Sequence, residues 1–300
     1  MSLTHIVLSL VIVVNSAFLV CFLRDYFKHR AEALVEPGNS LLIAPISFLV
    51  FFLSTFGISD FAIASSLYPK MKWVSEKKLP GTLNTECVIP VAVMALCYIS
   101  SIQVHIGTLL TAIVCQVLGA YITPRFVVKL PINIIKRCVV VGLFVAAIVI
   151  LANKFGVYPT GGEKMGLEGR ELMLFAVLCF VYGAFNNMGI GSYPLTMATV
   201  YAMGLSPVAA FPIMMGACTF SVPIGAMQFI NLGQYSRKIT FFASTWGVLG
   251  VLIAVFLVKS LNVSLLQWLV VIVILYSGVT MLRSSLWQEK VQKESEKHES

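Results

Sequence analysis

Hydrophobic residues occur in long segments separated by short polar or glycine-rich interruptions. The first apolar run covers residues 4–23, and a charged loop at 24–36 follows it. Two shorter runs come next, at 41–56 and 61–68, separated by a glycine-containing break. After a basic loop, the half ends in three long runs, at 82–102, 106–123 and 134–152. About 20 apolar residues cross a hydrocarbon core of about 30 Å, so the pattern predicts membrane helices.

The same order of runs recurs in the second half. A run at 172–185 is interrupted by glycines, a short run at 193–203 follows, and three long runs complete the series at 208–230, 239–258 and 265–282. Residues 40–153 and 171–283 are therefore predicted to be two copies of one unit, each a broken hairpin followed by three spans. Local matches agree with this alignment: Phe56-Gly57-Ile58-Ser59 pairs with Met188-Gly189-Ile190-Gly191, and Val117-Leu118-Gly119 with Val248-Leu249-Gly250.

The remaining segments complete the predicted domain organisation. Residues 1–39 form an N-terminal transmembrane helix and a basic loop, residues 154–170 an outer linker, and residues 284–300 a cytoplasmic tail. The first run lacks a basic n-region and a cleavage site of small residues, so we interpret it as a retained helix rather than a signal peptide. The predicted fold class is an all-α polytopic membrane protein with two inverted repeats, whose hairpins are either re-entrant or fully spanning.

The amino-acid composition indicates a protein embedded in a lipid bilayer. Hydrophobic residues make up 58% of the chain and charged residues 11%, and the mean hydropathy is +0.91. Soluble domains carry about 25% charged residues. The seven cysteines lie inside apolar runs, and no C-x-x-C pair occurs, so they are predicted to be small hydrophobic residues. No metal and no cofactor is expected.

The net charge of +8 is interpreted as membrane topology rather than as a nucleic-acid site. Basic residues on the cytoplasmic side orient membrane proteins. An N-terminus outside and a C-terminus in the cytoplasm place every strong basic cluster on one side, namely those at 24–30, 70–78, 125–137, 237–238 and the tail. With this assignment the second copy starts outside, so the two copies are inverted. Inverted repeats with interrupted segments at matching positions are typical of secondary transporters.

The two breaks suggest an anion site. Glycine at Gly57 and Gly189 frees the backbone from helical geometry, and the helix that restarts after each break exposes N–H groups with partial positive charge. Two such helix starts can bind an anion without Arg or Lys. Ser59 and Ser192 are suitable N-cap residues and hydroxyl donors. Close helix packing is the alternative role of these glycines.

The residues around the second break resemble a known family. The segments Gly189-Ile190-Gly191-Ser192-Tyr193-Pro194-Leu195 and Ser206-Pro207-Val208-Ala209-Ala210 are similar to the G-I-G-G-G…P-L…A pattern of the TauE/SafE sulfite exporters. This resemblance implies transport of sulfite, sulfonates or other small organosulfur anions across a bacterial inner membrane. The first copy departs from the pattern with Gly57-Ile58-Ser59-Asp60, where an ionised Asp60 would repel an anion.

Several polar residues are predicted at membrane depth. Asp60 and Glu86 are the candidates for proton coupling, because an unpaired carboxylate is costly there. The alternatives are that Asp60 caps its own helix and that Glu86 is interfacial. Gln116 is predicted to hold helices together. The predicted substrate-binding set is Gly57, Ser59, Asn84, Thr85, Asn186, Asn187, Gly189, Gly191 and Ser192.

No hydrolase, metalloprotease or nucleotide-binding motif occurs, so an enzyme is not expected. The predicted function is a secondary transporter for a small anion. A passive anion channel, an uptake permease for a small carboxylate and a non-transporting membrane subunit remain as alternatives. The predicted partners are the anion and membrane lipid, without nucleic acid. The oligomeric state is open, with a homodimer as one option.

Overall fold

The computed structural model describes residues 3–56, 58–75, 78–101, 104–122, 162, 164–186 and 191–260, together with seven positions between 268 and 283. The helices of the described residues are α1 (Leu3–Lys28), α2 (Arg30–Val35), α3 (Ser40–Thr55), α4 (Asp60–Lys70), α5 (Leu79–Ser101), α6 (Ile106–Ile122), α9 (Gly169–Asn186), α10 (Tyr193–Ala202), α11 (Pro207–Asn231), α12 (Arg237–Phe242), the π-helix η1 (Ala243–Gly247) and α13 (Val248–Ser260).

Five helices are long and apolar enough to cross a membrane by length and composition: Thr4–Lys28, Leu79–Ser100, Gly169–Asn186, Val208–Asn231 and Arg237–Leu257. The last of these joins α12, η1 and α13 into one span. The prediction of an all-α polytopic membrane protein is confirmed. The predicted spans at 134–152 and 265–282 lie outside the described residues, apart from the few positions in the second.

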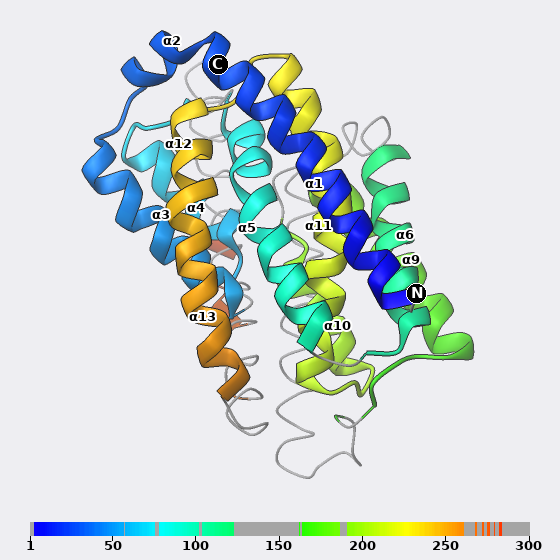
Figure 1. The fold of residues 1–300 in the computed structure, drawn as a ribbon. Coiled ribbons are helices and arrows are strands. Elements are labelled where there is room, and N and C mark those ends of the chain that lie inside the picture. The colour runs from blue at the N-terminus through cyan, green and yellow to red at the C-terminus, as the bar shows by residue number, and fades with distance from the viewer. Residues whose placement is uncertain are drawn as a thin grey trace, which may run out of the picture.

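Helices α5 and α11 form the centre of the bundle and pack along each other. In their most apolar windows 78% and 83% of the residues are buried, against 28% in α1. Large apolar side chains such as Val13, Val177 and Phe256 are exposed on the outer helices. Exposed apolar surface of this extent fits contact with lipid rather than with water. Figure 1 shows α1 running along the outside of the bundle from the side where α9 begins to α2 at the other end.

The loops gather at two opposite ends of the bundle. At one end, which we call the basic end, lie residues 36–39, 71–75 and 232–236. Here Ser236 Oγ donates a hydrogen bond of 2.7 Å to Glu36, and a side chain on Gly38 would meet the indole of Trp73. The lysines and arginines at 70–72 and 237–238 belong to this end. These two basic segments therefore lie at the same end of the bundle, as the sequence predicts.

At the other end, the linker end, lie residues 104–105, 164–168 and 203–206. The His105 N–H donates to the carbonyl of Met165 at 2.9 Å, and the Ser206 N–H donates to the carbonyl of Lys164 at 2.8 Å. These bonds tie the segment before α9 to the start of α6 and to the turn between α10 and α11. Helix α5 leads from the basic end to the linker end, and α11 leads back.

Each broken hairpin returns to the end from which it starts. Helix α3 leaves the basic end at Ser40 and α4 returns there at Lys70. Helix α9 leaves the linker end at Gly169 and α10 returns there at Ala202. The two hairpins enter from opposite ends, and because α4 and α10 have only 11 and 10 residues, too few to cross a hydrocarbon core, both are re-entrant. The described parts of the two copies run in opposite directions, in agreement with inverted repeats.

Matching glycines pack in matching ways in the two copies. A side chain at Gly119 of α6 would collide with the carbonyl oxygen of Phe180 in α9. A side chain at Gly250 of α13 would collide with the carbonyl oxygen of Phe48 in α3. The spacing from Phe48 to Phe180 equals the spacing from Gly57 to Gly189 in the sequence alignment. Small residues allow this backbone approach between helices, and the paired contacts support the predicted repeat.

The predicted charged loop at 24–36 is wrong, because most of it is helical. Helix α1 continues through Lys28 and α2 follows at Arg30. Asp25 and His29 stand one turn apart, with 3.1 Å between His29 Nδ1 and Asp25 Oδ1, and pairs at this spacing support a helix. The ring of Tyr26 stacks on Phe241 at 5.1 Å, so α12 holds the extended end of α1 in place.

Candidate functional site at the two helix breaks

Both predicted interruptions are present. Helix α3 ends at Thr55 and α4 begins at Asp60, whereas α9 ends at Asn186 and α10 begins at Tyr193. Three of the predicted site residues, Gly57, Asn187 and Gly189, lie outside the described residues. The others are buried or partly buried among helices of both copies.

The two breaks touch each other. A side chain at Gly191 would collide with Oγ of Ser59 and would lie 3.3 Å from Cβ of Phe61. Ser59 is only 3% exposed. One break belongs to the hairpin from the basic end and the other to the hairpin from the linker end. The starts of α4 and α10 therefore converge inside the bundle, as the sequence predicts.

At the second break the polar groups are paired within the protein. The backbone N–H of Ser192 donates to Asn186 Oδ1 at 3.0 Å. The Ser192 hydroxyl lies 3.0 Å from the thiol sulfur of Cys218 and makes no capping bond to α10. The predicted N-cap role of the Ser192 side chain is wrong, because the hydroxyl turns to α11 instead of to its own helix.

Sequence reasoning missed Cys218 and assigned Gln116 to packing. The Cys218 thiol lies 3.9 Å from Gln116 Oε1, and Gln116 Nε2 donates to Thr196 Oγ1 at 3.2 Å. These contacts connect α6, α10 and α11 around the second break. A signal was present, because Cys87 and Cys218 are separated by the same number of residues as Gly119 and Gly250, which marks them as equivalent positions of the repeat.

Two buried acids lie on neighbouring helices, Asp60 at the first break and Glu86 within α5. Asp60 and Glu86 are 2% and 1% exposed, and whether Glu86 is interfacial stays a prediction. The Tyr68 hydroxyl donates to Glu86 Oε2 at 2.5 Å. The other carboxyl oxygen of Glu86 and Oδ2 of Asp60 are buried without a hydrogen-bond partner. Among the described residues, neither acid has an ion-pair partner.

Two predicted substrate residues make contacts elsewhere. Asn84 Nδ2 donates to the Pro80 carbonyl at 2.9 Å, one turn back along α5. Thr85 Oγ1 lies 2.8 Å from Thr240 Oγ1 of α12. These bonds do not reach residues of the two breaks, so a role for Asn84 and Thr85 in binding stays a prediction.

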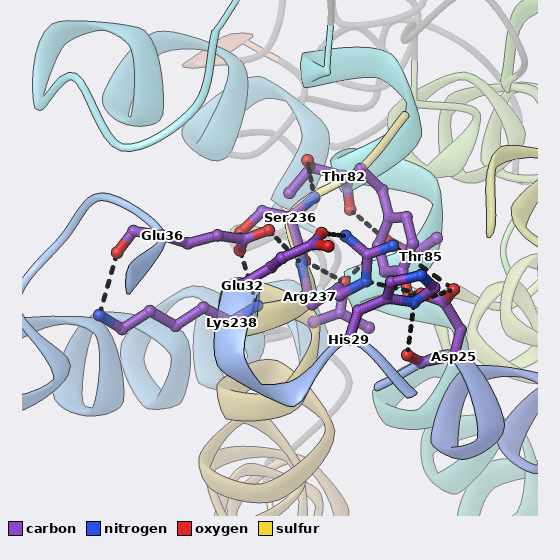
Figure 2. A network of polar contacts seen from close by, with 11 residues as sticks. Asp25, His29, Glu32, Glu36, Thr82, Thr85, Ser236, Arg237 and Lys238 are labelled. Carbon is purple, nitrogen blue, oxygen red and sulfur yellow. Dashed lines mark hydrogen bonds and ion pairs between the residues drawn. The ribbon is translucent and has the colours of Figure 1, made fainter. Parts of the chain in front are cut away.

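A polar network at the basic end was not predicted (Figure 2). Arg237 is 5% exposed, and its Nε lies 2.7 Å from Asp25 Oδ2. The Tyr235 hydroxyl donates to the same carboxylate at 2.5 Å. Burial and this hydrogen bond raise the pKa of Tyr235, so it remains a donor. Glu32 is 3.6 Å from Arg237 Nη1 but largely exposed.

Glu36 extends this network to the start of the last described span. Its carboxylate accepts hydrogen bonds from the backbone N–H groups of Arg237 and Lys238, at 3.3 and 3.0 Å. Lys238 Nζ in turn donates to the Gly38 carbonyl at 2.7 Å. A carboxylate at this position satisfies helix-start donors and complements the helix dipole. The loop that follows α2 therefore caps α12, a helix of the second copy.

A cavity of about 640 Å³ opens at the linker end, with His105, Lys164, Glu168 and Glu171 in its lining. Lys164 and Glu171 pair across it at 3.2 Å, and both are more than half exposed. The lining carries one lysine against two glutamates, so the cavity offers no excess of positive charge for an anion. Within the described ranges no cluster of His, Cys, Asp or Glu is arranged to hold a metal ion.

Interrupted hairpins that enter from opposite ends and meet inside a bundle are a feature of secondary transporters with inverted repeats. Residues 172–300 match the family model described as Sulfite exporter TauE/SafE, which confirms the predicted resemblance. This family comprises membrane transporters of sulfite or related anions. The match covers the second copy and the tail. Neither the curated proteins nor the solved structures gave a match to the chain.

Proposed function

We propose that the protein is a secondary transporter that moves a small anion, namely sulfite, a sulfonate or another small organosulfur anion, across the bacterial inner membrane. The contact between Ser59 and Gly191 carries this proposal. It brings two helix starts together inside the bundle, where N–H groups can bind an anion without a basic side chain. Irregular backbone at membrane depth is tolerated where protein or a water-filled cavity satisfies it.

The proposed orientation puts the basic end in the cytoplasm. Positively charged loops favour that side, and α1 then starts outside. The hairpin of α3 and α4 serves as the wall facing the cytoplasm, and the hairpin of α9 and α10 as the wall facing outward. Relative movement of the two copies around the contact of the breaks would expose the anion to each side in turn.

Proton coupling is part of the proposal. Asp60 and Glu86 are 2% and 1% exposed and lack ion-pair partners among the described residues, and carboxyl groups buried in membrane segments form proton relays. Protonation and deprotonation of one of these carboxyl groups would let a proton gradient drive transport of the anion.

Counter-flow in liposomes tests the function. Vesicles with the purified protein are loaded with unlabelled sulfite and diluted into radiolabelled sulfite, and a transporter then accumulates label transiently. With equal potassium on both sides and valinomycin to hold the membrane potential at zero, a passive anion channel gives no accumulation. Thiosulfate, methanesulfonate, sulfate and acetate serve as competing anions, so the small-carboxylate alternative is tested in the same assay.

The matched variants are Gly191→Val, which fills the contact of the two breaks, and Leu118→Ala on the exposed face of α6. We expect counter-flow to be lost in the first and kept in the second. Absence of sulfite, sulfonate and thiosulfate counter-flow in the wild-type protein contradicts the proposed function.

A further inference from the structure

We infer that the Asp60 carboxylate occupies the anion site at the first break, so that a substrate anion binds there only as Asp60 takes up a proton. The inference rests on the proposed function and deepens it by naming the group that carries the proton and the reason for the coupling. In this mechanism the protein's own carboxylate and the transported anion compete for the same donors.

The position of Asp60 is the first support. Asp60 is the first residue of α4, a helix of 11 residues, and its carboxyl group lies beside the backbone N–H groups of Asp60 and Phe61 and the hydroxyl of Ser54, which favour its charged form. These N–H groups lie at the helix start and have no partner within the helix. They are the groups that an anion at this break would use, and a tethered anion already holds them.

The surroundings of Asp60 are the second support. Its Oδ2 is buried and has no hydrogen-bond partner. The titratable groups near enough to interact electrostatically with Asp60 are Tyr68 on α4, Glu86 and Cys87 on α5, Tyr193 on α10 and Cys218 on α11. None of these groups carries a positive charge. A second anion beside an ionised Asp60 is strongly disfavoured in such a setting, and a proton on Asp60 removes the repulsion.

The second break provides the contrast. There the N–H of Ser192 is held by Asn186 Oδ1, which belongs to a neutral amide. An incoming anion can displace this amide without a change in charge. Among the described residues of the two breaks, only the first break has a charged occupant, although both breaks touch through Ser59 and Gly191. The asymmetry predicts one proton taken up for each anion bound.

The test measures anion affinity and proton uptake for the full-length protein in detergent. Methanesulfonate is the main probe because its charge is constant over the neutral range, and sulfite is the second. Calorimetry in buffers of different ionisation enthalpy gives the number of protons taken up. In the wild type we expect uptake of a proton and a loss of affinity of about tenfold per pH unit on the alkaline side.

Asp60→Asn keeps the size and a hydrogen-bond acceptor but removes the charge. We expect it to bind methanesulfonate at least as tightly as the wild type, with no proton uptake and no pH dependence. Glu86→Gln is the matched control, because it neutralises the neighbouring buried acid while leaving the helix start unchanged. It should keep the proton uptake and the pH slope. Asp60→Ser is the second variant if Asp60→Asn does not fold.

The outcomes separate the two proposals. If the neutral variants at 60 keep the proton uptake, or if Glu86→Gln abolishes it, Asp60 is not the coupling group and this inference is overturned while anion binding stands. If wild type and variants bind neither methanesulfonate nor sulfite at any pH, the proposed function fails and the inference falls with it.

Discussion

Gly191 lies against the hydroxyl of Ser59, so that the backbone of one helix break rests on the side chain of the other. Ser59 belongs to the hairpin that enters from the basic end, and Gly191 to the hairpin that enters from the linker end. No side chain fits at residue 191 in this arrangement. The contact thus joins the two inverted copies at the point where both helices restart.

Gly191→Ala is expected to destabilise the protein. The new Cβ collides with Ser59 Oγ, and overpacking of a buried site costs about 1–3 kcal/mol. Ser59→Ala in the same chain removes the colliding oxygen and should recover most of the loss. Thermal unfolding in detergent of the two single variants and the double variant measures this coupling. Equal losses with and without Ser59→Ala contradict the proposed contact.

The helix crossings at Gly119 and Gly250 predict a second effect. Alanine at either position collides with a carbonyl oxygen of the facing helix, at Phe180 or Phe48. Because backbone yields less readily than a side chain, we expect each variant to lower stability by about 1–3 kcal/mol. Leu118→Ala is the control, because Leu118 is 44% exposed. Similar melting temperatures for all three variants and the wild type contradict the assigned crossings.

Most helix boundaries were predictable because the ends of apolar runs fix where a helix can leave the lipid. The runs at 41–56 and 106–123 became α3 and α6 with shifts of only a residue at their ends. The glycine breaks were predictable for the same reason, since they interrupt apolar runs. The equivalence of the two copies followed from the order of these runs.

The partners of individual polar groups were not predictable. Whether Ser192 caps its helix or turns to Cys218 depends on the rotation of α11, which the apolar pattern leaves undetermined because the helix is buried nearly all round. The pair of Asp25 and Arg237 joins segments at opposite ends of the sequence. Positive-inside reasoning treats such charges as topological signals and assigns them no partner.

Of the two acidic neighbours of Arg237, Asp25 is expected to contribute far more to the stability of the protein than Glu32. Asp25 accepts two hydrogen bonds from the buried guanidinium, so Asp25→Ala leaves a charge without its partner, at a cost of about 3 kcal/mol. Glu32→Ala removes an exposed carboxylate at 3.6 Å and should cost less than about 1 kcal/mol. Unfolding in detergent compares the two, and equal effects contradict the assignment.

The same reasoning predicts rescue at this site. Arg237→Met removes the guanidinium and keeps an apolar stem of similar length. In the Asp25→Ala background it should recover part of the lost stability, because no buried charge is then left unpaired. The Asp25→Ala variant alone should therefore be less stable than the double variant. The opposite order would mean that Arg237 is stabilised mainly by contacts other than Asp25.

Tyr68 and Glu86 provide the last prediction. Tyr68→Phe removes the hydroxyl that donates to the buried Glu86 carboxyl, and leaving such an acceptor unpaired costs about 1–3 kcal/mol. Combining Tyr68→Phe with Glu86→Leu removes both partners and should be closer to the wild type in stability. Tyr182→Phe is the matched control, because it breaks a bond of 2.6 Å to the neutral hydroxyl of Thr199.

The control should lose about 0.5–1.5 kcal/mol, the range for a neutral pair. Tyr68→Phe also tests whether protein stability and proton coupling depend on different groups. Since the proton is assigned to Asp60, Tyr68→Phe should lower the melting temperature and leave the pH dependence of methanesulfonate affinity unchanged. If the affinity of Tyr68→Phe for methanesulfonate no longer depends on pH, the coupling group is Glu86 and not Asp60. Glu86 is the acid that Tyr68 contacts directly.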